Sequence, residues 1–373
     1  MEEKKRIIKK RKSLKRSNKK IGKKNQKSNK KKFKKDINKV YRAIFLSKII
    51  IIIVLSIIFQ TIYKKYRKLN KIYKYCLDCV NRINNLDSKC LDCSNDLLFK
   101  ELKIVSTKDT LDEIIKNKRS ISRFSDGEFS LIYGEISNFQ EYNQELSKRL
   151  LEIIGNNHKN KNLLVGIDFA YKKKELDLYI NYEVHFWTEF YKKNKFKLLK
   201  ILNLKRKYYS SDITRFYFKY KDKSHVPKYI SKLKKIWEGR DILIIEGEKT
   251  RVGIGNDLLN NSKSIKRIIC PAKHAFRVYD KIIESVSKVS KDILVLIALG
   301  PTASVLAFDL TNLGYQAVDI GHADLQYELY LRNATGWMLI PYKFVNEYNF
   351  GRDRVDDVKD PEYYKQIFDK ILY

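Results

Sequence analysis

The sequence predicts an α/β domain with a mostly parallel sheet and helices on both faces, preceded by a transmembrane helix and a helical stalk. From about residue 100 onward, short and almost uninterrupted apolar runs alternate with helical stretches, which is typical of parallel strands buried on both faces. Nearer the N-terminus, an apolar segment lies between two basic ones, and a heptad pattern follows it. We therefore expect a Rossmann-like domain over residues 101–373.

Residues 1–42 are strongly basic. The chain carries a formal net charge of +35, of which roughly +25 lies before Cys76, so the charge is concentrated at one end of the chain. Long Lys/Arg runs with few apolar residues cannot form a packed core. We expect a basic disordered tail, and we expect no specific nucleic-acid partner because the remaining residues keep only about +10.

Residues 43–63 are predicted to form a membrane anchor. The segment is apolar apart from Lys48, Gln60 and a few hydroxyl groups, and its length suits a helix that spans a bilayer. The alternative, a buried soluble helix, would need apolar partners on every side. About ten Lys/Arg precede the span and about seven follow it, which leans towards a cytosolic N-terminus without fixing the orientation. We expect a membrane protein.

Residues 64–100 are predicted to form a helical stalk. Apolar residues and cysteines alternate at spacings of three and four from Leu69 to Leu97, which is typical of a coiled-coil seam. The alternative is a four-thiolate zinc site. A stalk would allow a homodimer, and paired cysteines in an oxidising compartment. The cysteines concerned are Cys76, Cys79, Cys90 and Cys93. The fifth cysteine, Cys270, lies in an apolar run and is expected to be a buried packing residue.

The strands predicted in the main domain are short apolar runs, at residues 163–167, 242–245, 265–269, 293–299 and 317–320. Helical stretches such as 176–190 and 276–286 separate them. A further strand is expected to run into Phe124. In sheets of this kind, ligands bind beyond the carboxyl ends of the strands, so the polar residues that follow each run are candidate site residues.

An acidic pair follows the strand that is expected to end at Phe124, in the sequence SRFSDGEFSLIY. Asp126 and Glu128 flank Gly127, which we expect to let the backbone turn sharply. Two carboxylates at a strand end suit a hard divalent cation such as Mg²⁺ or Mn²⁺, which often bridges to nucleotide phosphates. The alternative is structural: Asp126 caps the following helix and Glu128 stabilises its first turn.

Polar residues also follow other predicted strands. The sequence EGEKTRVGIGND comes after 242–245 and offers Glu246, Glu248, Arg251, Asn256 and Asp257. After 293–299, Gly300 and Pro301 open a helix whose free amides near Thr302 could hold a phosphate, the alternative being an ordinary strand-to-helix turn. His322 could offer a neutral imidazole to a metal, although a lone histidine is more often structural.

Together these blocks resemble the GT-D type glycosyltransferases, which transfer a sugar from a nucleotide sugar and combine a Rossmann-like fold with a metal-binding Asp-x-Glu motif. The resemblance covers roughly residues 105–335 and rests on SRFSDGEF, FQEYNQELSKRL, IWEGRDILIIEGEKTRVGIGNDLL, IICPAKHAF and ALGPTASVLAFDLTNLGYQAVDIGHADLQYE. It implies that Asp126 and Glu128 are the metal-binding pair, with Mn²⁺ or Mg²⁺ as the cofactor. The family usually has Gly before the aspartate, where this chain has Ser125.

The expected function is transfer of a hexosyl group from a uridine diphosphate (UDP) sugar to a hydroxyl of a glycan or glycoprotein acceptor. The cation at Asp126 and Glu128, with His322 as a further candidate ligand, would neutralise charge on the leaving diphosphate. The candidate substrate-binding residues are Arg123, Arg251, Asn256, Asp257 and Thr302.

Glu248 is the candidate base that deprotonates the acceptor if the reaction inverts, with Glu246 and Asp319 as competitors. The rival function belongs to another class: a non-catalytic, membrane-anchored scaffold whose basic tail binds anionic lipid or nucleic acid. Such a scaffold would turn over no nucleotide sugar, with or without metal.

Overall fold

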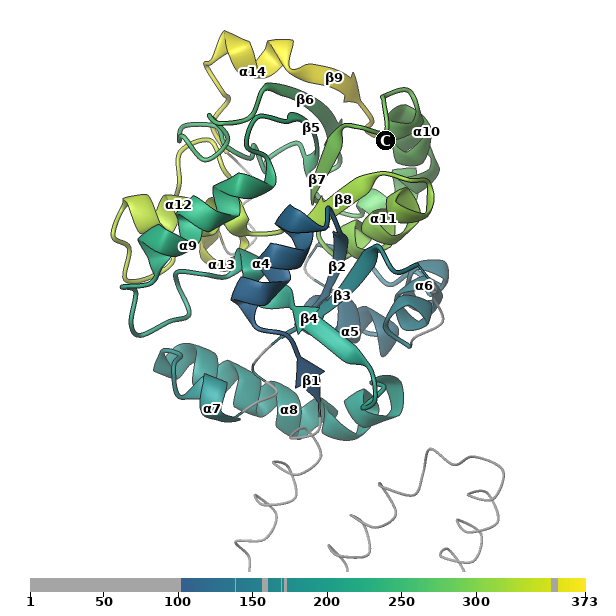
Figure 1. The fold of residues 1–373 in the computed structure, drawn as a ribbon, viewed down its shortest axis with the longest axis vertical. Coiled ribbons are helices and arrows are strands. Elements are labelled where there is room, and N and C mark those ends of the chain that lie inside the picture. Colours follow the sequence, from purple (N-terminus) through teal and green to yellow (C-terminus); the bar gives the residue numbers. More distant parts are fainter. Residues whose placement is uncertain (1–101, 138, 156–159, 169, 171–172, 350–354) are drawn as a thin grey trace, which may run out of the picture. The chain divides into compact units, whose positions relative to one another are not determined.

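The computed structural model describes residues 102–373, except residues 138, 156–159, 169, 171–172 and 350–354 (Figure 1). The predictions for the tail (1–42), the anchor (43–63) and the stalk (64–100) fall outside the described residues, and they stay predictions. Within the described ranges, no helix is both long and apolar enough to cross a membrane.

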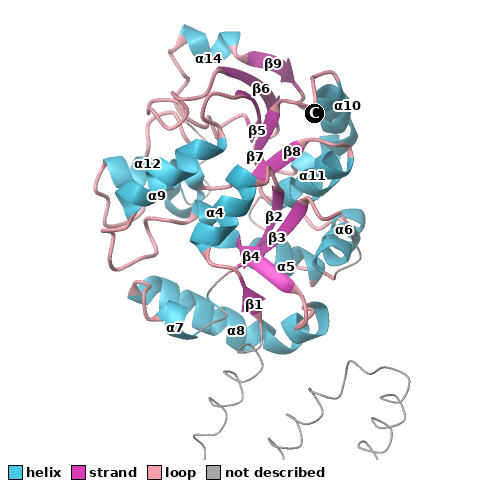
Figure 2. Ribbon diagram, in the orientation of Figure 1, coloured by secondary structure: helices cyan, strands magenta, loops and turns pink. Residues whose placement is uncertain are grey.

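The described residues form a nine-stranded sheet in which every pair of neighbouring strands is parallel (Figure 2). The strands are β1 (Lys103–Ile104), β2 (Ser120–Phe124), β3 (Leu163–Ile167), β4 (Lys207–Ser210), β5 (Asp241–Gly247), β6 (Ser264–Cys270), β7 (Leu294–Ala298), β8 (Gln316–Asp319) and β9 (Ile367–Lys370). Their order across the sheet is β1-β4-β3-β2-β8-β7-β5-β6-β9. The prediction of a mostly parallel α/β sheet is therefore confirmed.

Each predicted apolar run coincides with a strand, and the strand expected before the acidic pair is β2, which ends at Phe124. The sequence patterns do not predict β1, β4 or β9. These strands are short, and more exposed residues alternate with less exposed ones along them. A run of two to four residues is too short for a period of two to stand out, which explains the omission.

The helices that cover the sheet fall into two groups, which Figure 1 shows on opposite sides of it. The helices that share one apolar core are α4 (Thr107–Lys116), α9 (Val226–Leu233) and α12 (Ala323–Leu331). Those that share the other core are α5 (Asp126–Ile132), α6 (Gln144–Ile154), α10 (Tyr279–Ser287) and α11 (Pro301–Asn312).

The strands supply both cores at once. On β5, Leu243 and Ile245 belong to one core, whereas Ile242 and Ile244 belong to the other. All four side chains are 0% exposed, and burying such a side chain stabilises the fold by about 1.5–3 kcal/mol. Burial on both faces is the reason why the run reads as continuously apolar instead of alternating.

The predicted helix at 176–190 is divided in the structure. Helix α7 (Lys173–Leu176) ends, and α8 (Asn181–Ile201) begins after an extended break. In the break, Tyr179 pairs antiparallel with Tyr220 and donates a hydrogen bond from its hydroxyl to Asp212 at 3.2 Å. These tertiary contacts outweigh the local helical pattern.

The remaining elements are short. The predicted helix at 276–286 consists of a 3₁₀ turn, η5 (Ala275–Val278), followed by α10. The other 3₁₀ turns are η3 (Ser211–Thr214) and η4 (Lys234–Ile236), and the last two helices are α13 (Asn346–Asn349) and α14 (Pro361–Lys365). Cys270 lies fully buried at the end of β6 among core side chains, which confirms its prediction as a packing residue.

Candidate active site

A cavity of about 490 Å³ opens at the carboxyl ends of the strands. Its lining includes residues that directly follow strands on both halves of the sheet, namely Ser125 after β2, Asp168 after β3, Ser211 after β4, Pro271 after β6 and Leu299 after β7. Because the strands are parallel, these residues reach the same edge of the sheet. This is the edge at which open α/β sheets bind their ligands.

The acidic pair lies in the first turn of α5, on one wall of the cavity. The N-cap of this helix is Ser125, not Asp126 as the structural alternative supposed. The backbone N–H of Ser125 donates to Glu128 Oε2 at 2.8 Å, and its hydroxyl donates to Asp126 Oδ1 at 3.1 Å. The serine that departs from the family pattern therefore holds both carboxylates in place.

The expectation that Gly127 makes a sharp turn is wrong. Gly127 lies inside α5 and is not among the residues with positive φ, and an added Cβ would meet only Pro301 Cγ at 3.9 Å. The change from strand to helix falls at Ser125, which is the N-cap of α5 and still has an extended backbone (φ −135°, ψ −161°).

Glu128 is half-buried and surrounded by mixed charges. Burial, reinforced by the carboxylates of Asp319 and Asp126, raises the pKa of Glu128 to about 8, against the opposing effects of the Ser125 amide and Arg123. A divalent cation beside the pair would offset this repulsion and favour the ionised form. The donor set thus fits Mg²⁺ or Mn²⁺, which accept one or two carboxylates and complete their shells with water and substrate phosphates.

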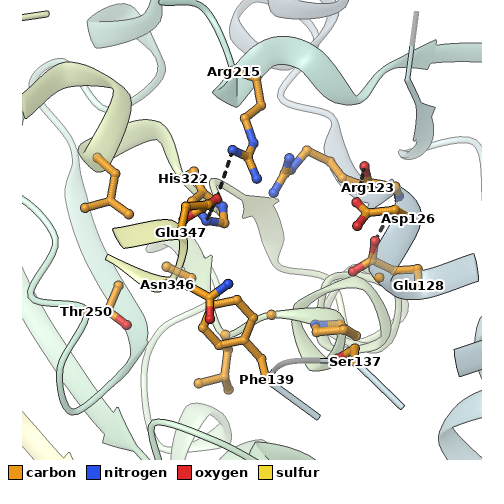
Figure 3. Close-up of a pocket in the computed structure, with 18 of the residues that line it drawn as sticks. Arg123, Asp126, Glu128, Ser137, Phe139, Arg215, Thr250, His322, Asn346 and Glu347 are labelled. Atoms are coloured by element: carbon orange, nitrogen blue, oxygen red, sulfur yellow. Dashed lines mark hydrogen bonds and ion pairs between the residues drawn. The ribbon is translucent and has the colours of Figure 1, made fainter. Parts of the chain in front are cut away.

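His322 is not brought to the acidic pair. Figure 3 shows it on the opposite side of the pocket, where its Nε2 lies 3.5 Å from Glu347 Oε1. Burial, together with the charges of Arg215 and Arg123, lowers the pKa of His322 to about 3 despite Glu347. In the described part of the chain, no three His, Cys, Asp or Glu side chains are grouped closely enough to hold a metal by themselves.

Arg123 lines the pocket, as the sequence predicted. Its Nη2 donates to Asp319 Oδ1 at 2.9 Å and its Nη1 donates to Thr214 Oγ1 at 2.6 Å. The guanidinium also approaches Gly321 so closely that an added Cβ there would lie 1.9 Å from Arg123 Nη2. Gly321 has a φ of +38°, so its lack of a side chain serves both the backbone and the arginine.

Arg215 and Glu347 face the acidic pair, and the sequence reasoning missed both. Arg215 Nη1 lies 3.4 Å from Glu347 Oε1, and the charges of Glu347, Glu183 and Asp126 together raise the pKa of Arg215 against the effect of burial. Neither residue follows a sheet strand: Arg215 follows η3, and Glu347 lies in α13. No local pattern could have identified them.

The predicted cluster after β5 does not line the cavity. Arg251 donates to the carbonyls of Tyr342 (2.7 Å) and Asp356. The other two candidate substrate-binding residues of this cluster also have partners: Asn256 donates to Asp324 at 2.9 Å, and Asp257 pairs with Lys234 at 2.8 Å. These residues join their loop to neighbouring segments, and the adjacent Gly247, Lys249 and Thr250 line the cavity instead.

The candidate bases are also placed by the structure. Glu248 is outside the cavity lining, and Glu246 is fully buried, where it pairs with Arg267 at 2.6 Å and accepts from the Val252 amide at 2.7 Å. Asp319 lines the cavity but holds Arg123. Glu246 and Asp319 therefore have structural partners that leave them poorly suited to proton transfer.

Thr302 lies just behind the cavity wall. Its side chain is 0% exposed, and its hydroxyl donates to Gln140 Oε1 at 3.3 Å. Gly300 and Pro301, at the start of α11, do line the cavity. Pro301 has no N–H, and the Ala303 amide donates to the Gly300 carbonyl at 2.9 Å. The amide of Thr302 is therefore the one that the start of this helix can offer to an anion.

An all-parallel α/β domain with facing acidic and basic groups at its carboxyl edge is the class of domain that binds phosphorylated ligands. A family model described as glycosyltransferase GT-D fold matches residues 121–348. The chain belongs to this family, as the sequence resemblance implied.

Named relatives and solved structures agree with this assignment. Glycosyltransferase GlyD of Streptococcus pneumoniae is 35% identical over 282 residues, which are 75% of this chain and 34% of that protein. The probable glycosyl transferase Gly of Streptococcus gordonii is 35% identical over 72% of this chain and 39% of its own length. The chain thus spans little more than a third of the curated relatives that it matches.

The solved domains are matched almost completely. One, described as a highly conserved domain (DUF1792) with a distinct glycosyltransferase fold, aligns with a TM-score of 0.70 and 37% identity over 75% of this chain and 99% of that chain. Another, described as a new glycosyltransferase (DUF1792) from Streptococcus sanguinis, aligns with a TM-score of 0.68 and 34% identity over 72% of this chain and 99% of that chain.

Proposed function

We propose that this domain transfers a hexosyl group from a UDP-sugar to a hydroxyl of a glycan or glycoprotein acceptor, using Mn²⁺ or Mg²⁺ at Asp126 and Glu128. The observation that carries the proposal is the arrangement of charge in the cavity. The acidic pair after β2 lies beside Arg123, and Arg215 reaches into the pocket opposite the pair (Figure 3). A diphosphate bridged to a cation needs both kinds of charge.

The leaving diphosphate is the group that needs stabilisation, because negative charge accumulates on it as the glycosidic bond breaks. A divalent cation, when bound, supplies positive charge there. From the chain itself, Arg215 lines the same cavity, as does Lys249 after β5. At the start of α11, Gly300 has a φ of +55°, and a backbone without a side chain at that point allows a phosphate to approach the Thr302 amide.

Acceptor activation requires a carboxylate inside the cavity if the transfer inverts configuration. Glu248 does not line the cavity, so we assign this role to Glu183 on α8, which does. Burial raises the pKa of Glu183, which makes its carboxylate a stronger base at neutral pH. Arg215 interacts electrostatically with both Glu183 and Asp126, so the proposed base and the proposed metal site share a neighbour.

The test is turnover of a panel of UDP-sugars by the full chain, with Mn²⁺ and with excess chelator. We expect slow hydrolysis of at least one donor and faster transfer once a hydroxyl acceptor is added, both abolished by the chelator. A chain that neither binds UDP with Mn²⁺ nor turns over any donor would contradict the proposal and favour the scaffold.

We further propose that residues 43–63 attach the protein to a membrane. The support is the uncharged run at 49–59, which lies between two basic flanks. The full chain is then expected to sediment with membranes and to need detergent for release. Recovery of the full chain in the supernatant at low salt without detergent would refute the attachment.

A further inference from the structure

One wall of the cavity is aromatic. It consists of Tyr182, Phe186 and Trp187 on α8, with Phe218 and Trp337 from two other segments. We propose that this aromatic wall, together with Gln326 and Glu183, is the acceptor subsite and holds a pyranose ring of a neutral glycan. The inference rests on the proposed function and adds where the acceptor binds.

Two members of the wall expose much of their side chains. Tyr182 is 62% exposed and Phe186 is 38% exposed. They lie four residues apart on α8, so they present neighbouring rings on the same helix face. Behind them Trp187, only 4% exposed, packs against Phe190 and Tyr191 at ring distances of 5.6 and 5.7 Å. The exposed rings therefore stand on a rigid aromatic base.

A second observation points to a polar ligand at the same wall. Gln326 is 1% exposed and lines the cavity. Its Oε1 accepts from the backbone N–H groups of Tyr217 (3.1 Å) and Phe218 (2.8 Å), which fixes the orientation of the amide because a flip would oppose donors to donors. In the described part of the chain, Nε2 of Gln326 has no hydrogen-bond partner.

An unpaired buried donor is energetically unfavourable, and a hydrogen bond to a ligand oxygen would remove that cost. The ring pair next to Gln326, Phe218 and Trp337, has its centroids 4.6 Å apart. A donor beside aromatic faces is a combination that suits a sugar. The C–H face of a pyranose carries slight positive charge and packs on the negative face of an aromatic ring, while its hydroxyls need hydrogen-bond partners.

Charge distinguishes this wall from the place of the nucleotide. Asp168 and Asp212 follow β3 and β4 and share Lys219, while Glu183 on α8 and Glu347 balance the charge of Arg215. This end of the cavity therefore offers a phosphate no excess of positive charge. On the other half of the sheet, Lys249 and Lys273 follow β5 and β6 and line the cavity. The diphosphate belongs between the acidic pair and these lysines, and an uncharged, hydroxyl-rich ligand belongs at the aromatic end.

The chain contains three tryptophans, two of which can report ligand binding at the site by their fluorescence. Trp187 and Trp337 line the cavity, whereas Trp237 is buried in the core. Fluorescence of the full chain is titrated with neutral disaccharides such as lactose and cellobiose, and separately with UDP plus Mn²⁺. The variants are Phe186→Ala, Tyr182→Ala and Gln326→Glu, the last of which keeps an oxygen for the two backbone amides. Phe368→Ala, on β9 and 39% exposed, is the matched control.

We expect a disaccharide to change the fluorescence of the wild type, and we expect its affinity to fall at least about tenfold in Phe186→Ala and Gln326→Glu. UDP affinity should stay the same in these variants, and Phe368→Ala should behave as the wild type. In transfer assays, the KM for the acceptor should rise while donor hydrolysis is unchanged.

Three results would overturn the inference: no disaccharide bound by the wild type, equal affinity in all variants, or loss of UDP affinity in Phe186→Ala, which would place the nucleobase on the wall. A wild type that binds no UDP and hydrolyses no donor contradicts the proposed function instead. In that case the disaccharide titrations still decide whether the wall binds sugar.

Discussion

Arg123 Nη2 lies 2.9 Å from Asp319 Oδ1, and this ion pair joins the ends of the neighbouring strands β2 and β8 at the floor of the cavity. The side chains are 14% and 5% exposed, so water screens the pair only weakly. Asp319 fixes the guanidinium at the base of the acidic pair, where its charge also acts on Glu128. The geometry of the proposed metal site therefore depends on residues that do not bind the metal.

The first prediction concerns Gly321→Ala. The added Cβ would lie 1.9 Å from Arg123 Nη2, and the φ of +38° disfavours any side chain, so Arg123 must leave its place. We expect a loss of about 1–3 kcal/mol in the free energy of unfolding and a large fall in kcat. Gly336→Ala is the matched control, because its Cβ would meet no atom within 4 Å. If the two variants were equally active, the position of the Arg123 guanidinium would not matter for activity.

The second prediction separates structure from catalysis at Glu246. Glu246→Gln should weaken the pair with Arg267, whose side chain is only 1% exposed, and leave a buried charge poorly compensated. We expect a loss of about 2–4 kcal/mol in denaturant unfolding, with kcat changed less than about threefold at temperatures where the variant is folded. A stable variant with a severe loss of kcat would instead identify Glu246 as the base.

The third prediction is a pH dependence. Burial, aided by Arg215 and Arg123, lowers the pKa of His322 to about 3 in the folded state, against about 6.5 when unfolded. Between these values the unfolded chain binds the extra proton, so the contribution of His322 to stability falls as the pH drops below about 6.5.

Replacing His322 by Gln removes this dependence. From pH 7 to pH 5, we expect the unfolding free energy of the variant to decline less than that of the wild type, by on the order of 1–2 kcal/mol. His185 is exposed, so the variant His185→Gln is the control, and its unfolding free energy should decline as much as that of the wild type. Urea unfolding curves at the two pH values provide the measurement, and identical declines in wild type and His322→Gln would show that His322 is protonated at pH 5.

Much of the fold could be predicted because its cause is local. Strands buried on both faces read as apolar runs, as Leu163–Ile167 and Asp241–Gly247 illustrate. The break at Tyr179 could not be predicted, because its cause is a distant partner, Tyr220. Local sequence favours a continuous helix there, and only the folded chain supplies the competing contacts.

The same distinction applies to the site. Asp126 could be found because it lies two residues after the end of a strand, and the parallel sheet fixes where strand ends lie. Arg215 and Glu347 reach the cavity through segments that are far apart in the chain. The polar loop after β5 was misleading for the opposite reason: its side chains, such as Asn256, are polar because they hydrogen-bond to neighbouring segments and to the loop backbone.

The central claim, that the acidic pair of α5 holds the cation that carries the diphosphate, is tested most directly by Asp126→Asn. A neutral amide is a weaker ligand for a hard cation, so we expect sugar transfer by the full chain to fall at least about a hundredfold. Asp280→Asn, an exposed acid in the first turn of α10, is the matched control and should remain active.

Binding of UDP with Mn²⁺ gives the same test without turnover. The thermal stability of Asp126→Asn should match that of the wild type in the absence of metal, because Ser125 caps the helix in both. The stabilisation that Mn²⁺ plus UDP gives the wild type should disappear in the variant. A fully active Asp126→Asn, with wild-type transfer that persists in excess chelator, would contradict the account and reduce the acidic pair to the first turn of a helix.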